Sequence, residues 1–152
     1  MALRWLLAAS HLLALGIGLG AVWARARALG AVARGDDPAA VGRTLIADTW
    51  WGVAAMIWIG TGLWRLFAGT EKPPAYYYGS HVFWTKMAML GAVLVLELAP
   101  MVGLIRWRTA LRRGEAPGLG PAQRWARISR VQAGLVILML LAATAMARGL
   151  GA

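Results

Sequence analysis

Four long apolar blocks alternate with shorter polar segments along the chain. Each block holds about 20 residues with few charges, which is the length that an α-helix needs to cross the hydrocarbon core of a bilayer. The blocks cover residues 3–23, 45–67, 82–105 and 128–147, and the pattern predicts one helix over each. The predicted fold is therefore all-α: one transmembrane domain over residues 1–152, built as a four-helix bundle in a lipid bilayer.

Residues beside the first two blocks refine their ends. Arg25, Arg27 and Arg34 follow the first block directly, where the mature part of an exported protein normally avoids positive charge. We therefore predict a retained helix and not a cleaved signal peptide. Asp37-Pro38 forms a good N-cap and first-turn pair, so the second helix is expected to begin before residue 45.

Basic residues gather beside two of the three connecting segments. Eleven of them flank the first and third connections, and only four lie near the opposite helix ends. The positive-inside rule places the arginine-rich segments in the cytoplasm, with both termini outside, and we predict a multi-pass membrane protein. The eleven are Arg25, Arg27, Arg34, Arg43, Arg106, Arg108, Arg112, Arg113, Arg124, Arg127 and Arg130; the four are Arg4, Arg65, Lys72 and Arg148.

Composition excludes several classes of function. Hydrophobic residues make up 60% of the chain and charged residues 14%, whereas a globular soluble domain carries about a quarter charged residues. There is no cysteine, which rules out disulfides, thiolate metal sites and a cysteine nucleophile. The net charge of +10 includes no basic stripe interleaved with aromatics, so nucleic-acid binding is not expected.

Of the ionisable side chains inside the predicted helices, four are singled out as candidates for function, because an ionisable group is costly in lipid. His11 could ligate a haem iron or relay protons, or only hydrogen-bond a neighbouring helix. Lys86 lies just inside the outer end of its block. It is a candidate for function, or its long aliphatic chain could simply carry the ammonium to the lipid headgroups. Glu97 lies deeper and must be protonated or paired, which makes it a proton-exchange or ion-pair candidate. Asp48, near the inner end of its helix, is interpreted as structural.

A second group of polar residues is predicted at the outer end of the bundle. His11, Arg65, His81 and Lys86 all fall toward that side, among aromatic residues. A porphyrin needs an axial nitrogen, apolar walls and cations for its propionates. The hypothesis is b-type haem held by His11, with Lys86 assisting, Arg65 steadying the propionates and His81 nearby; no other metal site is predicted. The alternative is that Arg65 and His81 are ordinary interfacial residues.

One local motif resembles a known family. Phe83-Trp84-Thr85-Lys86, at the start of the third block, together with His11 in the first, resembles the HemJ-type protoporphyrinogen oxidases, which are small bacterial membrane proteins. The resemblance implies haem-ligand or catalytic roles for His11 and Lys86 in an oxidoreductase that takes hydrogen from protoporphyrinogen and passes electrons to quinone or the respiratory chain.

A likeness over nearly the whole chain is to an uncharacterised bacterial family of four-helix membrane proteins, and the arrangement is more distantly similar to the membrane part of CopD-type copper-resistance proteins. The first of these resemblances implies a four-helix fold in the bacterial inner membrane, without an established activity. Its motifs are Ala47-Asp48-x-x-Trp51-Gly52, Thr61-Gly62-Leu63-x-Arg65, Tyr76-Tyr77, Phe83-Trp84-x-Lys86-Met87, Glu97-x-x-Pro100-Met101 and Arg106-Trp107-Arg108.

Two alternatives to haem binding stay open. One is a non-enzymatic membrane subunit in which the polar residues only hold helices together. The other is a metal or small-solute transport component, with Glu97 and Asp48 lining the inner half of a path. In each case self-association is predicted through small residues that allow close helix approach: Gly16, Gly18, Gly20, Gly60 and Gly62.

Overall fold

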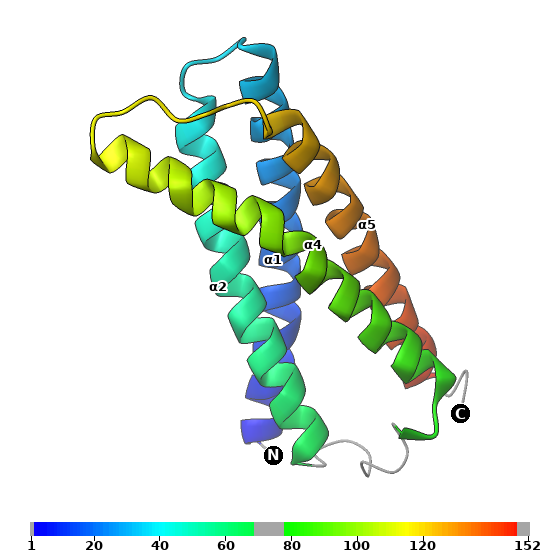
Figure 1. Cartoon of the computed structure of the whole chain (residues 1–152). Coiled ribbons are helices and arrows are strands. Elements are labelled where there is room, and N and C mark those ends of the chain that lie inside the picture. Colours follow the sequence, from blue (N-terminus) through cyan, green and yellow to red (C-terminus); the bar gives the residue numbers. More distant parts are fainter. Residues whose placement is uncertain (1, 69–77, 149–152) are drawn as a thin grey trace.

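The computed structural model is all-helical, as the apolar pattern predicted (Figure 1). It describes residues 2–68 and 78–148, and within these ranges there are four helices and no β-strand. The motif residues Tyr76 and Tyr77 lie outside the described ranges. The helices are α1 (Ala2–Arg34), α2 (Ala40–Phe67), α4 (His81–Arg112) and α5 (Ala122–Ala147).

The helices run alternately up and down, so both termini lie at the same end of the bundle (Figure 1). We call this the termini end; the opposite end, at Arg34 and Arg112, is the arginine-rich end. Helix α1 is central, because it packs against both α2 and α5, and α4 packs mainly on α5. Helix α4 crosses in front of α2 at an angle, and the two diverge toward the termini end (Figure 1).

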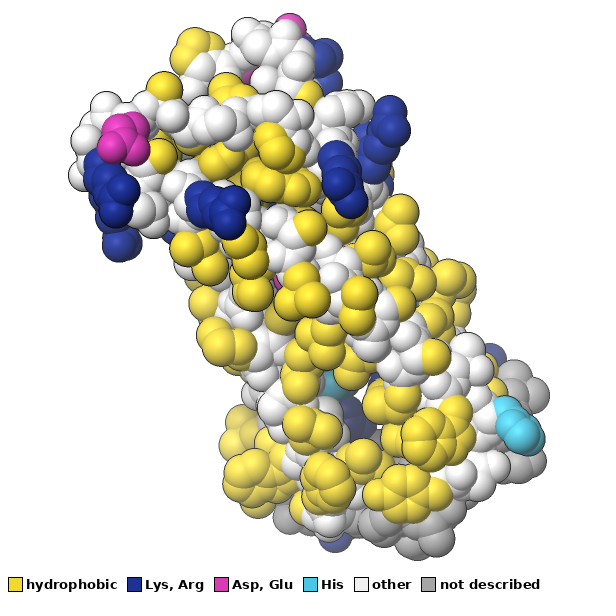
Figure 2. Space-filling model, in the orientation of Figure 1, with side chains coloured by type: hydrophobic (Ala, Val, Ile, Leu, Met, Phe, Trp, Pro, Cys, Tyr) yellow, Lys and Arg dark blue, Asp and Glu magenta, His cyan; other side chains and the backbone are white. Residues whose placement is uncertain are grey.

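The surface has the character of a membrane protein. Helices α1, α4 and α5 are long and apolar enough to cross a membrane. Helix α2 is not one of these three, but it runs beside α1 over a similar length (Figure 1). Figure 2 shows hydrophobic side chains covering the visible face between the two ends, with lysine and arginine side chains gathered at the arginine-rich end.

The helices are longer than the apolar blocks predicted, and the extra turns lie at the arginine-rich end. Helix α1 continues to Arg34 where an end at residue 23 was predicted, and α4 continues to Arg112 where 105 was predicted. Helix α2 begins at Ala40, before its apolar block, which confirms the early start that Asp37-Pro38 predicted, and α5 begins at Ala122, before the predicted 128. Hydropathy marks the part of a helix that lies in lipid, whereas Ala, Leu and Arg continue a helix into water because of their high helix propensity.

Glycines in the left-handed conformation end two of these extended helices. Gly35 and Gly114 both have φ of 72°, which glycine adopts without steric cost. At the end of α4 the Gly114 N–H donates to Leu111 O and the Glu115 N–H to Ala110 O, at 3.1 and 2.9 Å. This is the Schellman pattern, and it satisfies carbonyls that the end of the helix leaves without partners.

Asp37 stabilises the turn before α2, although it is not the N-cap that the sequence predicted. Helix α2 begins at Ala40 with Ala39 as its N-cap residue. The Asp37 carboxylate accepts the Ala39 N–H at 2.8 Å and also pairs with Arg43. These two hydrogen bonds, that from Arg43 foremost, hold the pKa of Asp37 below its ordinary value. The charged carboxylate therefore stabilises the turn at every pH above the ordinary pKa of aspartate. This stabilisation is lost as the pH falls through the lowered pKa of Asp37.

A tryptophan pair fills the core at the arginine-rich end. The rings of Trp107 and Trp125 lie 5.3 Å apart and are almost fully buried. Trp125 packs directly on the backbone of Gly103, where an added Cβ would lie 2.0 Å from Cη2 of the ring. Helix α4 can approach α5 this closely only because residue 103 has no side chain.

Gly103→Ala is therefore expected to destabilise the protein by about 1–3 kcal/mol, because a methyl group forced into a packed core displaces the indole. Gly91→Ala on the same helix is the matched control, since an added Cβ there meets nothing within 4 Å. Unfolding by denaturant in detergent would compare the two variants with the wild type. Equal stability of the two variants would contradict the packing of Trp125 on Gly103.

Candidate functional site

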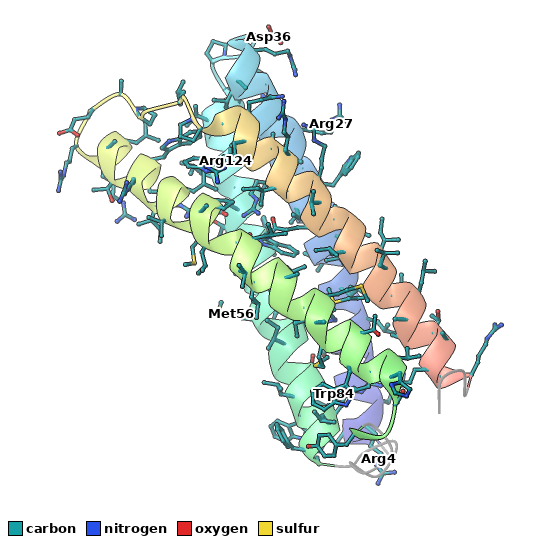
Figure 3. The ribbon with its side chains drawn as sticks, turned by 45° about the vertical axis from the view of Figure 1, so that its right-hand side comes forward. Arg4, Arg27, Asp36, Met56, Trp84 and Arg124 are labelled. Carbon is teal, nitrogen blue, oxygen red and sulfur yellow. The ribbon has the colours of Figure 1, made fainter. Side chains whose placement is uncertain are left out.

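The polar residues of the four helices form two separate groups. One group surrounds a buried arginine where the helices cross, between the middle of the bundle and the arginine-rich end. The other lines a cavity at the termini end. In Figure 3, Arg4 and Trp84 mark the termini end, and Asp36 and Arg124 mark the arginine-rich end.

Arg25 is the centre of the first group, which we call the arginine hub. It extends from α1 toward the other three helices, and its side chain has no exposed surface. Nη1 donates to Asp48 at 2.8 Å and to Glu97 at 2.7 Å, and Nη2 donates to Glu97 at 2.8 Å and to Gln132 at 2.9 Å. Nε donates to Ser129 at 3.1 Å. A guanidinium has five N–H groups, so every one of them has an acceptor.

Glu97 receives further donors besides the arginine. Its Oε2 accepts the indole N–H of Trp51 at 3.0 Å and the amide of Gln132 at 2.7 Å. The same amide group donates to Val93 O at 3.1 Å, which ties α5 to the backbone of α4. Of the two roles left open by the sequence, proton exchange or ion pairing, this geometry is that of an ion pair.

A second arginine completes the charge balance of the hub. Arg108 of α4 lies 2.8 Å from Oδ2 of Asp48, and it also donates to Leu45 O and to Thr49 at 3.0 and 3.1 Å. Arg25 and Arg108 therefore carry two positive charges against the two negative charges of Asp48 and Glu97. Burying charges is costly unless they are paired and hydrogen-bonded, and this arrangement meets both conditions while joining all four helices.

Sequence reasoning predicted that Glu97 is protonated or paired, but it did not identify Arg25 as the partner, because it assigned Arg25 to a cytoplasmic connection. That assignment was wrong: the helix continues past residue 23 and turns Arg25 into the bundle. Asp48 and Glu97 were the available signal, because two carboxylates inside predicted membrane helices need cations. Nothing in the sequence alone says which of the sixteen lysines and arginines faces inward.

The second group lines a cavity of about 480 Å³ at the termini end. All four helices contribute to its wall, and apolar side chains such as Leu15, Met87, Leu90 and Met139 form much of it. In Figure 2 a recessed hollow is visible between the diverging parts of α2 and α4, with a histidine and a basic side chain behind the hydrophobic rim. The volume falls within the range of about 300–1,000 Å³ that is usual for ligand pockets.

Three of the residues predicted to bind a cofactor meet in this cavity. His11 reaches it from α1, Arg65 from α2 and Lys86 from α4. His81 does not: it is the exposed first residue of α4 and is not part of the wall. Asp48 and Glu97 are also absent from the wall, because they belong to the arginine hub.

His11 is held between neighbouring groups of α2. Its Nδ1 lies 2.9 Å from Oγ1 of Thr61. The ring lies 5.9 Å from that of Trp58, at an angle of 36°. Gly62 leaves room for the imidazole, because an added Cβ there would lie 3.1 Å from its Cε1 atom. The ring is thus packed against both a hydroxyl and an indole at the edge of the cavity.

The cavity wall carries more positive than negative charge. Lys86 is half-buried, and among the described residues no carboxylate lies within 4 Å of its ammonium. Arg65 contributes a second positive charge to the same wall. No aspartate or glutamate of the described residues lines the cavity. This wall therefore has the features of a site for an anionic ligand.

The glycines predicted to mediate self-association do not all face the same way. Gly18 packs against Ala54 and Trp51, and Gly62 packs against His11, so these two serve contacts within the chain. An added Cβ at Gly16, Gly20 or Gly60 would meet nothing within 4 Å. Self-association through these three positions stays a prediction.

Comparison with known proteins agrees with the membrane character of the helices. No curated protein and no solved structure matches the chain. A family described as "Predicted membrane protein (DUF2214)" matches residues 3–151, which is nearly the whole chain. Together with the four helices and their apolar surface, this match identifies the chain as a membrane protein that belongs to the DUF2214 family.

Proposed function

We propose that the protein binds a b-type haem, or a related tetrapyrrole, in the cavity at the termini end, in the inner membrane of a bacterium and with both termini outside. The observation that carries the proposal is that His11, Arg65 and Lys86, from three different helices, line one cavity of about 480 Å³. An imidazole, two cations and apolar walls are the groups that a porphyrin with two propionates requires.

Each group has a distinct role in this proposal. His11 would bind the iron through a ring nitrogen, and Lys86 and Arg65 would neutralise the propionates. Leu15, Leu90 and Met139 would enclose the apolar faces and exclude water. When bound, haem would supply an iron that exchanges one electron. Binding the ligand, neutralising its charge and excluding water would be the roles of these side chains.

The order of the residues along the bundle supports one orientation of the ligand. Arg65 and Lys86 lie roughly 3 and 8 Å along their helices from the termini end, given a rise of about 1.5 Å per residue. Trp58 and Met139 lie roughly 13 and 12 Å from the same end by the same reckoning. Acidic groups would therefore point toward the headgroups, and the apolar edge toward the middle of the bilayer.

The rival hypotheses receive different support. A transport path lined by Glu97 and Asp48 would need carboxylate oxygens that a solute can reach, but both residues are bound to arginines in the hub. A purely structural subunit would account for the hub, but it gives no reason for a half-buried lysine in an apolar cavity. An oxidase activity of the HemJ type, with His11 and Lys86 as catalytic residues, is a narrower hypothesis that becomes testable once haem is bound.

The absorption spectrum of the protein purified in mild detergent tests the proposal. The oxidised protein is expected to show a Soret band, and the reduced protein is expected to show sharp bands at longer wavelength. His11→Ala should abolish these bands, whereas His81→Ala, which changes the exposed second histidine, should keep them. A protein that stays colourless after haem is offered, or bands that survive in His11→Ala, would contradict the proposal.

A further inference from the structure

We propose that Thr61 is a positioning residue that holds neutral His11 in the tautomer with hydrogen on Nδ1, so that Nε2 carries the lone pair. The tautomer itself follows from the hydrogen bonds of the Thr61 hydroxyl in the protein without ligand. Its consequence for haem, that iron binds through Nε2, rests on the proposed function.

The hydrogen bonds of Thr61 decide the direction of its contact with His11. The hydroxyl has a single proton. Its oxygen, Oγ1, lies 2.7 Å from Ile57 O and 3.1 Å from Trp58 O. Both of these partners are carbonyl oxygens, which can only accept. The proton is therefore directed to the backbone of α2, and the oxygen is left to accept from Nδ1 of His11 at 2.9 Å.

A neutral imidazole carries one proton, so a proton on Nδ1 leaves Nε2 as the basic nitrogen. Free histidine in water prefers the opposite tautomer, with hydrogen on Nε2, so the contact with Thr61 reverses the ordinary preference. Histidines that bind metals usually donate their other ring N–H to an oxygen, which fixes the tautomer and the ring orientation. The hydroxyl oxygen of Thr61 is the acceptor of this kind for His11.

Packing keeps the ring in this position. Gly62, the next residue on α2, lies against Cε1 of His11, and the indole of Trp58 lies 5.9 Å from the ring. These contacts come from successive turns of one helix, so a single rigid element sets both the position of the imidazole and the direction of its hydrogen bond.

Nitrogen NMR of the protein without haem tests the tautomer directly. The chain has two histidines, so His81→Gln leaves His11 as the only one. With ¹⁵N-labelled histidine, at a pH where the ring is neutral, the chemical shifts should show a protonated Nδ1 and an unprotonated Nε2. A protonated Nε2 in this protein would overturn the proposal.

Three variants in the same background give the test its specificity. Thr61→Val should shift His11 toward the Nε2–H tautomer, whereas Thr61→Ser, which keeps the hydroxyl, should retain the Nδ1–H form. Thr85→Val is the matched control, because Thr85 also donates to a carbonyl four residues earlier but lies exposed on α4. An unchanged tautomer in Thr61→Val, or the same change in Thr85→Val, would refute the role of Thr61.

Titration with haem separates this inference from the proposed function. Loss of the hydrogen bond in Thr61→Val should weaken haem binding by about 10–100-fold, as is usual when the partner of a metal-bound histidine is removed. Thr61→Ser should restore most of the affinity. If the wild type shows the expected tautomer but binds no haem, the proposed function fails and the positioning role stands. If haem binds equally well to all variants, the positioning role fails and haem binding stands.

Discussion

Arg25→Met is expected to destabilise the bundle by about 3–5 kcal/mol, which is the usual cost of removing one partner from a buried ion pair. Methionine keeps the apolar stem but leaves Asp48 and Glu97 in the interior without the cation that joins them. Ser129 and Gln132 lose a donor in the same step. Because the hub joins all four helices, we expect the whole bundle to loosen and not only α1.

Unfolding in detergent, followed by circular dichroism, measures this loss. Arg27→Met is the matched control, because Arg27 lies two residues away on the same helix but is exposed (Figure 3). Exposed substitutions of this kind change stability by about 0.5 kcal/mol or less. If Arg25→Met and Arg27→Met were equally stable, the hub would not be the connection that the structure indicates.

A combined variant separates the ion pairs from mere packing. Replacing Arg25, Arg108, Asp48 and Glu97 together with apolar or amide residues of similar size should recover much of the stability, since a buried ion network replaced as a whole is often tolerated. Recovery would show that the cost in Arg25→Met comes from the unpaired carboxylates. A combined variant no more stable than Arg25→Met would assign the cost to lost packing instead.

Lys86→Met is expected to have opposite effects on stability and on ligand binding. Without its ammonium the cavity loses a charge that no described carboxylate neutralises, so the protein without ligand should become more stable by about 0.5–2 kcal/mol, as often happens when a functional residue is replaced. Binding of haem should weaken by roughly 30-fold, because losing a charged partner of a propionate costs about 2 kcal/mol.

Two controls make this result specific. Lys86→Arg keeps the positive charge and should retain most of the affinity, whereas Arg4→Met removes an exposed charge at the termini end and should change neither quantity. Thermal unfolding and haem titration of the same preparations give both values. Lower stability together with unchanged affinity in Lys86→Met would assign this lysine a structural role and remove it from the site.

The helices could be predicted closely from the sequence, but their ends could not. Each apolar block lies within one observed helix, because a segment in lipid must satisfy its own backbone hydrogen bonds. The ends at Arg34, Ala40, Arg112 and Ala122 lie outside the apolar blocks. There the helix continues through residues with good helix propensity until a glycine or a turn stops it, and hydropathy does not detect such positions.

The candidate site was predictable in part. His11 and Lys86 were identified as exceptional residues for their positions in apolar helices. Arg65 was added because of its predicted place at the outer end, and the three residues line one cavity. Thr61 and Trp58 were not recognised as parts of this site, because a threonine and a tryptophan in a membrane helix are ordinary residues. Their roles depend on the face of α2 that meets α1, which one sequence does not specify.

What the sequence by itself determined is the solvent of each segment: which stretches lie in lipid, which lie in water, and which end of the bundle carries the positive charge. Hydropathy and charge are local properties, so they can be assigned residue by residue. What only the tertiary structure decided is which polar groups meet. Arg25 and Glu97 are 72 positions apart, and the partner of each buried charge is fixed by how α4 crosses the other helices. That crossing depends on packing at contacts such as Gly103 with Trp125, and packing is a property of all four helices together.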